Sequence, residues 1–313
     1  MRLWRPGLSR IVQLIVTLWG ASVVIWSMIL LAPGDPARRL LIARGIPDPL
    51  AEDVAAARRE LRLDQPVVVR YVRWLGDVVR GDFGASWRTN RSVLSEFGDR
   101  FGATAVLGVA TMVFVVVFTV PMTLIAARWR ERWPDKVMQV GSSIGTSLPS
   151  FLVSLVLLHV VVLEWGWGQV LSDGSVGSVW LPASALSIGV AATWTRLLRG
   201  GMVGVLDTSL ADICRSRGAG PWRIMTRVAL PNALVRFLPF MALTVGALVG
   251  GAAVVESVVD WPGMGAYLVD AINARDLPVI QAYVLLATVA YVVTANGADV
   301  LARRLDPRLG IER

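Results

Sequence analysis

Few side chains in this sequence could carry out chemistry. Lys136 is the single lysine, His159 the single histidine and Cys214 the single cysteine. A phosphate-binding P-loop needs a Gly-Lys-Ser/Thr run, whereas Lys136 follows Asp135 and precedes Val137. Because His159 and Cys214 lie on different segments, neither a metal cluster nor a disulfide is expected. The sequence therefore predicts no catalytic residue, no cofactor and no metal site in this chain.

The most unusual stretch is an arginine-rich segment, Ser216–Asn232, that also contains two glycines and two prolines. Residues 207–214 before it can form a helix, which the two glycines interrupt, and Pro221 can start a new turn. The apolar residues expected on one face are Trp222, Ile224, Met225 and Val228. A short amphipathic helix of this kind can lie in a groove on a soluble partner. The alternative is a basic helix that rests on anionic lipid headgroups.

The composition is that of a polytopic membrane protein. Hydrophobic residues make up 55% of the chain and the mean hydropathy is +0.59, above the usual range of a soluble domain. A membrane-spanning helix needs about 20 mostly apolar residues. Six windows qualify as spans: Ile11–Leu31, Ala103–Ala127, Val137–Leu163, Leu181–Leu198, Ala233–Val255 and Gln281–Ala302. The first is longer than a signal-peptide core and lacks a cleavage site, so we interpret it as a retained span.

Arginine-rich connections orient the six predicted spans. The connections 127–137 and 198–233 are rich in arginine, whereas 163–181 and 255–281 are mostly acidic. By the positive-inside rule, both termini and the two arginine-rich connections are cytoplasmic. The net charge of +8 is then mainly a topology signal, and nucleic-acid binding is not expected.

The long loop Pro33–Gly102 has helical signals of its own. Asp48-Pro49 is typical of a helix start, and a second helix is expected to follow Pro66 and to end at Gly81. Such a structured loop could be where an external partner docks. Bends are expected at Pro149 and Pro239. Small-xxx-small pairs such as Gly141 and Gly145 favour close helix packing within the chain over a dimer motif.

A proton-coupled carrier usually has acidic residues near the centres of its spans. The six predicted spans contain none there. Arg236 lies deeper in a span than the other arginines and either lines a pathway or snorkels to the surface. Transport against a gradient would therefore need an energy source in another protein.

The spacing of the arginine-rich segment resembles the pattern E-A-A-x3-G-x9-I-x-L-P of bacterial ABC-importer permeases. Asp212-Ile213-Cys214 replaces the first triplet, and Gly218, Val228, Leu230 and Pro231 fall at the expected offsets. Six further pieces resemble the B-type permease subunit of dipeptide, oligopeptide and nickel importers: Leu31–Ala37, Leu61–Thr89, Ser147–Leu158, Arg196–Arg199, Gly250–Ala282 and Leu305–Gly310.

This resemblance implies an all-α, six-helix permease of type I. It implies that a coupling helix docks on an ATP-hydrolysing subunit through Asp212, Ile213, Cys214, Gly218, Trp222, Arg223, Val228, Leu230 and Pro231. A second segment is expected to form an elbow at the outer gate, with a plain hairpin as the alternative: Glu256, Asp260, Trp261, Pro262 and Gly263. The tryptophan of this segment suits a membrane–water boundary.

The predicted organisation is an N-terminal span with an external cap loop (residues 1–102), a core permease domain (103–302, with the coupling segment 207–231) and a cytoplasmic tail (303–313). The expected partners are a C-type permease, two ATP-binding subunits that hold ATP and Mg²⁺, an extracytoplasmic solute-binding protein, membrane lipid and a peptide substrate. The expected location is the bacterial cytoplasmic membrane. Because no His/Cys/Met cluster favours metal, peptides are preferred over nickel or a metal chelate. Two further hypotheses are an autonomous channel or carrier and a membrane scaffold.

Overall fold

The computed structural model describes residues 5–31, 34–167, 172 and 174–305. These residues form helices, turns and one isolated bridge between Ala85 and Ser92, and they contain no β-sheet. The chain divides into two compact units, residues 1–102 with 263–292 and residues 103–262 with 293–313. The second unit thus begins where the predicted core domain begins, and residues 263–292 group with the N-terminal unit. Residues 306–313 of the predicted tail lie outside the described residues.

The first unit contains α1 (Arg5–Leu31), α2 (Pro36–Ala43), α3 (Ala51–Glu60), α4 (Val67–Val79), the start of α5 (Val93–Arg128), α12 (Met264–Ala274) and the first part of α13 (Leu277–Leu305). The two helices predicted in the external loop are confirmed as α3 and α4. Gly81, with a φ of +85°, follows the end of α4. The helix α2 was not predicted; Asp35 caps it by accepting a hydrogen bond from the backbone N–H of Ala37 at 3.1 Å.

A buried carboxylate holds distant segments of the first unit together. Asp276, 2% exposed, accepts hydrogen bonds from Ser86 Oγ at 2.5 Å and from the backbone N–H groups of Trp87 and Arg88 at 3.1 and 3.4 Å. Its partners lie in the turns after α4, so this one side chain fixes the conformation of residues 86–88.

The second unit contains the rest of α5, α6 (Trp133–Ser147), α7 (Ser150–Leu157), the π-helix η1 (Leu158–Glu164), α8 (Trp180–Leu206), α9 (Ser209–Ser216), α10 (Pro221–Ile224), the π-helix η2 (Met225–Ala229), α11 (Leu230–Val258) and the end of α13. The predicted bend at Pro149 is confirmed, because α6 and the following α7–η1 helix meet at 99°. Proline disfavours a helical conformation for the residue before it, and Leu148 is extended.

Helices in three stretches are long and apolar enough to cross a membrane: Val93–Arg128, Pro221–Leu248 and Leu277–Ala298. The bent pair Trp133–Ser147 and Ser150–Glu164 is a fourth candidate if it forms one broken span. Within the described residues, Val12–Met28 of α1 is a shorter apolar helix, and α8 does not qualify. The total of six spans therefore stays a prediction.

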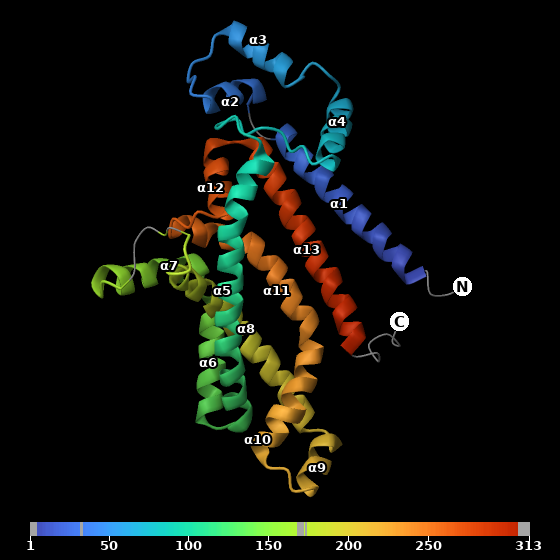
Figure 1. The fold of residues 1–313 in the computed structure, drawn as a ribbon, viewed down its shortest axis with the longest axis vertical. Coiled ribbons are helices and arrows are strands. Elements are labelled where there is room, and N and C mark those ends of the chain that lie inside the picture. Colours follow the sequence, from blue (N-terminus) through green and yellow to red (C-terminus); the bar gives the residue numbers. More distant parts are fainter. Residues whose placement is uncertain (1–4, 32–33, 168–171, 173, 306–313) are drawn as a thin grey trace. The chain divides into compact units, whose positions relative to one another are not determined.

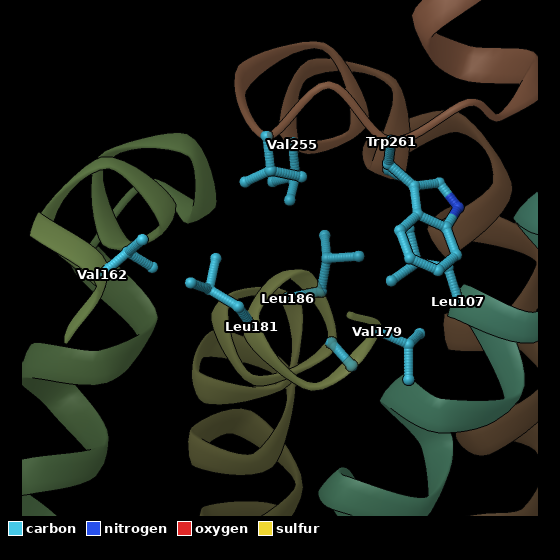
Figure 2. Packing of buried hydrophobic residues seen from close by; sticks show 10 residues of the cluster. Leu107, Val162, Val179, Leu181, Leu186, Val255 and Trp261 are labelled. Atoms are coloured by element: carbon cyan, nitrogen blue, oxygen red, sulfur yellow. The ribbon is translucent and has the colours of Figure 1, made fainter. Parts of the chain in front are cut away.

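The core of the second unit brings α5, α8, η1 and the end of α11 together around Trp261, whose side chain is fully buried. Figure 2 shows its ring beside Leu107 and Val179. A second cluster joins α5, α8, η2 and α11, and includes Leu198, Met202 and Met225. Burial of these apolar side chains positions the segment between α8 and α11.

Candidate functional site

The predicted coupling segment connects the ends of α8 and α11 within the second unit. Helix α8 ends at Leu206 with Asp207 as its C-cap residue, and α9 follows after a short turn. Figure 1 shows α9 and α10 together beyond the lower ends of α8 and α11. Gly218 has a φ of +79°, a left-handed conformation that separates α9 from α10. The helix–break–helix prediction for this segment is therefore confirmed.

The apolar side chains of this segment point in two directions. Ile224 and Met225 are each 3% exposed, and Val228 and Leu230 pack against the cluster that contains Met225. The prediction that Trp222, Ile224, Met225 and Val228 share one docking face was wrong. Ile224, Met225 and Val228 instead hold the segment onto its own unit. They can do so because η2 continues directly into α11 and shares the buried face of that helix.

A different set of apolar residues is exposed. Leu210 and Ile213 on α9 and Trp222 on α10 are 46%, 50% and 51% exposed. We call these three residues the exposed trio. Arg215, Arg217 and Arg223 are also exposed. Large apolar side chains next to cations are typical of a surface that a partner or a membrane covers.

The remaining predicted coupling residues contribute neither to the exposed trio nor to the buried contacts of the segment. Asp212 is exposed and pairs with Arg215, with Oδ1 and Nη1 2.6 Å apart. Cys214 is a half-buried free thiol. Pro231 is exposed in the first turn of α11. A Cβ atom at Gly218 would meet no other atom within 4 Å, so this position requires glycine for its backbone conformation alone.

Two ion pairs connect α8 and its C-cap residue to the first turn of α6 and to the turn before α6, and sequence reasoning missed both. Asp135 is fully buried and accepts hydrogen bonds from Nε and Nη2 of Arg199, both at 2.5 Å, and from the backbone N–H of Glu131 at 2.8 Å. Arg130 donates two hydrogen bonds to Asp207 at 2.7 and 3.0 Å. This hydrogen bonding raises the pKa of Arg130. The second pair holds the residue at which the coupling segment begins.

The second predicted segment begins inside α11. Glu256 is fully buried there and accepts a hydrogen bond from Thr104 Oγ1 at 3.1 Å. The helix ends at Val258, and Asp260 takes a φ of +52° before Trp261. Pro262 is the last residue of the second unit, and Gly263 precedes α12 in the first. A turn at this point is thus confirmed, whereas its role as an outer gate stays a prediction.

Trp261 does not fit the membrane–water boundary that was predicted for it. Its indole N–H donates to the carbonyl oxygen of Ala103 at 3.0 Å, and none of its side chain is exposed. The apolar ring packs in the core of the second unit, and its single N–H donor is satisfied within that unit. The sequence could not distinguish these two environments, since tryptophan suits both.

Two further ionisable residues, Arg236 and His159, belong to neither segment. Arg236 is exposed on α11, and its role in a pathway stays a prediction. His159 Nε2 lies 3.3 Å from Glu164 Oε1, and both side chains are exposed. No cluster of three or more His, Cys, Asp or Glu residues that could hold a metal ion occurs within the ranges that the structure describes.

Comparison with known proteins decides the family. Residues 119–311 match the family described as binding-protein-dependent transport system inner membrane component, and residues 4–108 match its N-terminal family. The chain belongs to this permease family. The glutathione transport system permease proteins GsiC of Escherichia coli K12 and of Shigella dysenteriae serotype 1 are each 35% identical to it over 302 residues, which covers 96% of this chain and 97% of the relative. The GsiC protein of Salmonella paratyphi A has the same identity and coverage.

Family membership gives the segment between α8 and α11 a context. The permease is an integral protein of the bacterial inner membrane and a subunit of a binding-protein-dependent ABC importer of the peptide and nickel type. Such an importer works with ATPase and solute-binding partners. The exposed trio is therefore a candidate surface for one of these soluble partners.

Proposed function

We propose that this permease moves di- or oligopeptides into the cell, driven by ATP hydrolysis in separate subunits that dock on the exposed trio. The observation that carries this proposal is the exposure of Leu210, Ile213 and Trp222 on short helices. The buried Ile224 at the end of α10 and Met225 at the start of η2 anchor the segment to the second unit. A rigid attachment transmits a movement of the docked subunit to α8 and α11, whereas a loosely held loop would absorb it.

In this proposal the coupling segment and both termini face the cytoplasm, as the arginine distribution predicts. The chain itself hydrolyses no ATP, and ATP and Mg²⁺ bind in two partner subunits. A related C-type permease completes the pathway, and an extracytoplasmic binding protein delivers the solute.

The cargo proposal rests on the relatives and on the chain's own ligand chemistry. The matched relatives transport glutathione, according to their names, and glutathione is built from amino acids. A site for bare nickel would favour clustered histidine, cysteine or carboxylate ligands, and the described residues hold no such cluster. We therefore favour short peptides over nickel or a metal chelate.

The docking proposal is tested by Trp222→Ala. Loss of a central aromatic anchor commonly costs about 2 kcal/mol of binding or more, so binding of the ATPase subunit should weaken about 30-fold. The measurement is the Kd between the reconstituted full chain and the purified ATPase subunit. Thr226→Ala is the matched control, because this exposed hydroxyl donates only to the Trp222 carbonyl at 2.8 Å. Equal affinities for the two variants would mean that the trio is not the docking surface.

The cargo is tested separately by uptake into cells with and without the chain. Labelled dipeptides, glutathione and nickel are compared. Loss of peptide or glutathione uptake with nickel uptake unchanged supports the proposal. Loss of nickel uptake alone would assign the permease to the metal branch.

A further inference from the structure

The first unit contains a cavity of about 340 Å³ that the coupling function does not use. Its lining comes from α1, the start of α2, the end of α3 and the turn after it, α4, Trp87 and the start of α13. Three tryptophans contribute to the wall, Trp26, Trp74 and Trp87. The rings of Trp26 and Trp74 lie 5.3 Å apart. The volume is within the range of small-molecule sites, and apolar aromatic walls are typical of them.

Two buried hydrogen-bond donors in this lining have no acceptor within the described part of the chain. They are the indole N–H of Trp26 and the amide nitrogen of Gln281. The two side chains are 9% and 6% exposed. An unsatisfied buried donor costs about 1–3 kcal/mol, so an acceptor that reaches either nitrogen from the cavity would remove this cost.

The arginines of the lining add positive charge to these donors. The guanidinium of Arg70 lies 5.7 Å from the centre of the Trp26 ring, and burial lowers its pKa. Arg73 donates to the neutral Gln65 at 3.1 Å, and Arg62 also lines the cavity.

The acidic residues of the lining already have partners. Glu60 accepts from Arg44 at 2.6 and 3.0 Å, and the hydrogen bond between them raises the pKa of Arg44. Asp77 lies 3.5 Å from Arg80. The carboxylates of the lining are thus engaged by arginines other than Arg70, and the cavity favours a negatively charged occupant.

We propose that this cavity binds an oxyanion that carries an apolar group. The oxyanion is bound by Arg70, Trp26 Nε1 and Gln281 Nε2, and the apolar group lies against the tryptophan rings. A small organic carboxylate has this chemistry, and so does the phosphate headgroup of an anionic lipid. The proposal is independent of the coupling function, because all the lining residues belong to the first unit.

The test uses the full chain in phosphatidylcholine nanodiscs and radiolabelled N-acetylphenylalanine in equilibrium dialysis. We expect saturable binding that weakens at least about tenfold when the carboxylate is replaced by an amide, and about tenfold in Arg70→Gln. Gln281→Leu, which removes the amide donor at similar size, should also weaken binding. Arg59→Gln is the matched control, because Arg59 is exposed on α3 and donates only to the Ala55 carbonyl.

A second arm identifies a lipid source. The chain is extracted from membranes that contain phosphatidylglycerol, and retained lipid is measured by mass spectrometry. Phosphatidylglycerol that is retained by the unchanged protein and lost in Arg70→Gln would support the oxyanion site with a lipid as its occupant. The proposal is overturned if neither the binding of the carboxylate nor the retention of the lipid depends on Arg70.

Discussion

Asp276 shows how a single buried side chain can define a loop. Its two oxygens receive one hydroxyl and two backbone N–H groups from residues 86–88. The backbone N–H groups of Trp87 and Arg88 lie in a turn and have no helical carbonyl oxygen to donate to. The Asp276 carboxylate supplies the acceptors that a helix or strand would otherwise provide. The hydroxyl donor lies 190 residues away in the sequence, and neither periodicity nor spacing could reveal it.

We expect Asp276→Asn to loosen residues 86–88 without unfolding the chain. The amide keeps one acceptor oxygen but directs an N–H₂ group at a donor, which costs about 1–3 kcal/mol. Hydrogen exchange at Trp87 and Arg88 should accelerate about 5- to 150-fold. Asp270→Asn is the control, since Asp270 is exposed and its ion pair with Arg88 spans 4.0 Å. Equal exchange rates in the two variants would contradict the role given to Asp276.

Residue type alone was enough to predict the break at Gly218 but not the ion pair between Asp135 and Arg199. Gly218 was correctly predicted as a break, because positive φ is a property of glycine itself. Asp135 and Arg199 were missed as a site, although both residue types are visible in the sequence. Their significance comes from a pairing across 64 residues, which only the packing of α6 on α8 creates.

At the scale of elements, α6 and α8 approach each other at a glycine. A Cβ atom added to Gly145 would lie 2.9 Å from the Cβ of Ala192 and 3.7 Å from the carbonyl oxygen of Ile188. A contact of that length requires one helix to shift. Gly141, on the same helix, has open space at its Cβ position. The small-xxx-small pair predicted from the sequence therefore contains one close-packing residue, and it acts within the chain.

We expect Gly145→Ala to lower the thermal stability of the permease, at a cost of about 1–3 kcal/mol from overpacking. Adding Ala192→Gly should recover part of the loss, because it removes the methyl group that the new side chain would meet. Gly141→Ala should be neutral or slightly stabilising. Unfolding temperatures in detergent provide the measurement. A double variant no more stable than the single one would place the strain elsewhere.

The ion pairs near the coupling segment should differ in strength. Arg199→Leu leaves the fully buried Asp135 without its cation, which commonly costs about 3–5 kcal/mol. Arg130→Gln removes a pair with Asp207 in which both side chains are exposed, and solvent screens such a pair, so its loss should be much smaller. Chemical denaturation of the two variants checks this difference. Similar losses would show that burial does not set the strength of these pairs.

Element boundaries were predicted where a short local signal decides them. A helix was predicted to start at Asp48-Pro49, yet α3 begins at Ala51 with Leu50 as its N-cap residue. The same pair at Asp35-Pro36 does cap and begin α2, and that helix was not predicted. The bend at Pro149 followed from proline chemistry. The burial of Ile224 and Met225, at the junction of α10 and η2, could not be predicted in this way, because it depends on how the segment packs against its own unit.

At the scale of the whole molecule, the chain passes between its two units at residues 102, 262 and 292. The first and last passages lie inside α5 and α13, and the middle one lies in the turn after Trp261. Hydrophobic patterning placed the start of the predicted core domain at residue 103, which is also where the second unit begins, inside α5. The return of residues 263–292 depends on contacts such as Asp276 with Ser86, which patterning does not contain.

We expect the chain alone to be inactive in transport. In vesicles that contain only this permease and ATP, peptide accumulation should remain at background, because the proposed function places the energy source in other subunits. Adding the C-type permease, the ATPase subunits and the binding protein should restore accumulation. Omission of each component in turn is the control. Solute accumulation by the chain alone would favour the autonomous carrier.

The position of Cys214 has a practical consequence. It is the single thiol of the sequence, half-buried on α9 between the exposed Ile213 and Arg215. A maleimide fluorophore would therefore label the unmodified protein at one place only. That place adjoins the exposed trio, so under the proposed docking the emission of a single dye would follow each arrival and departure of an ATPase subunit in real time.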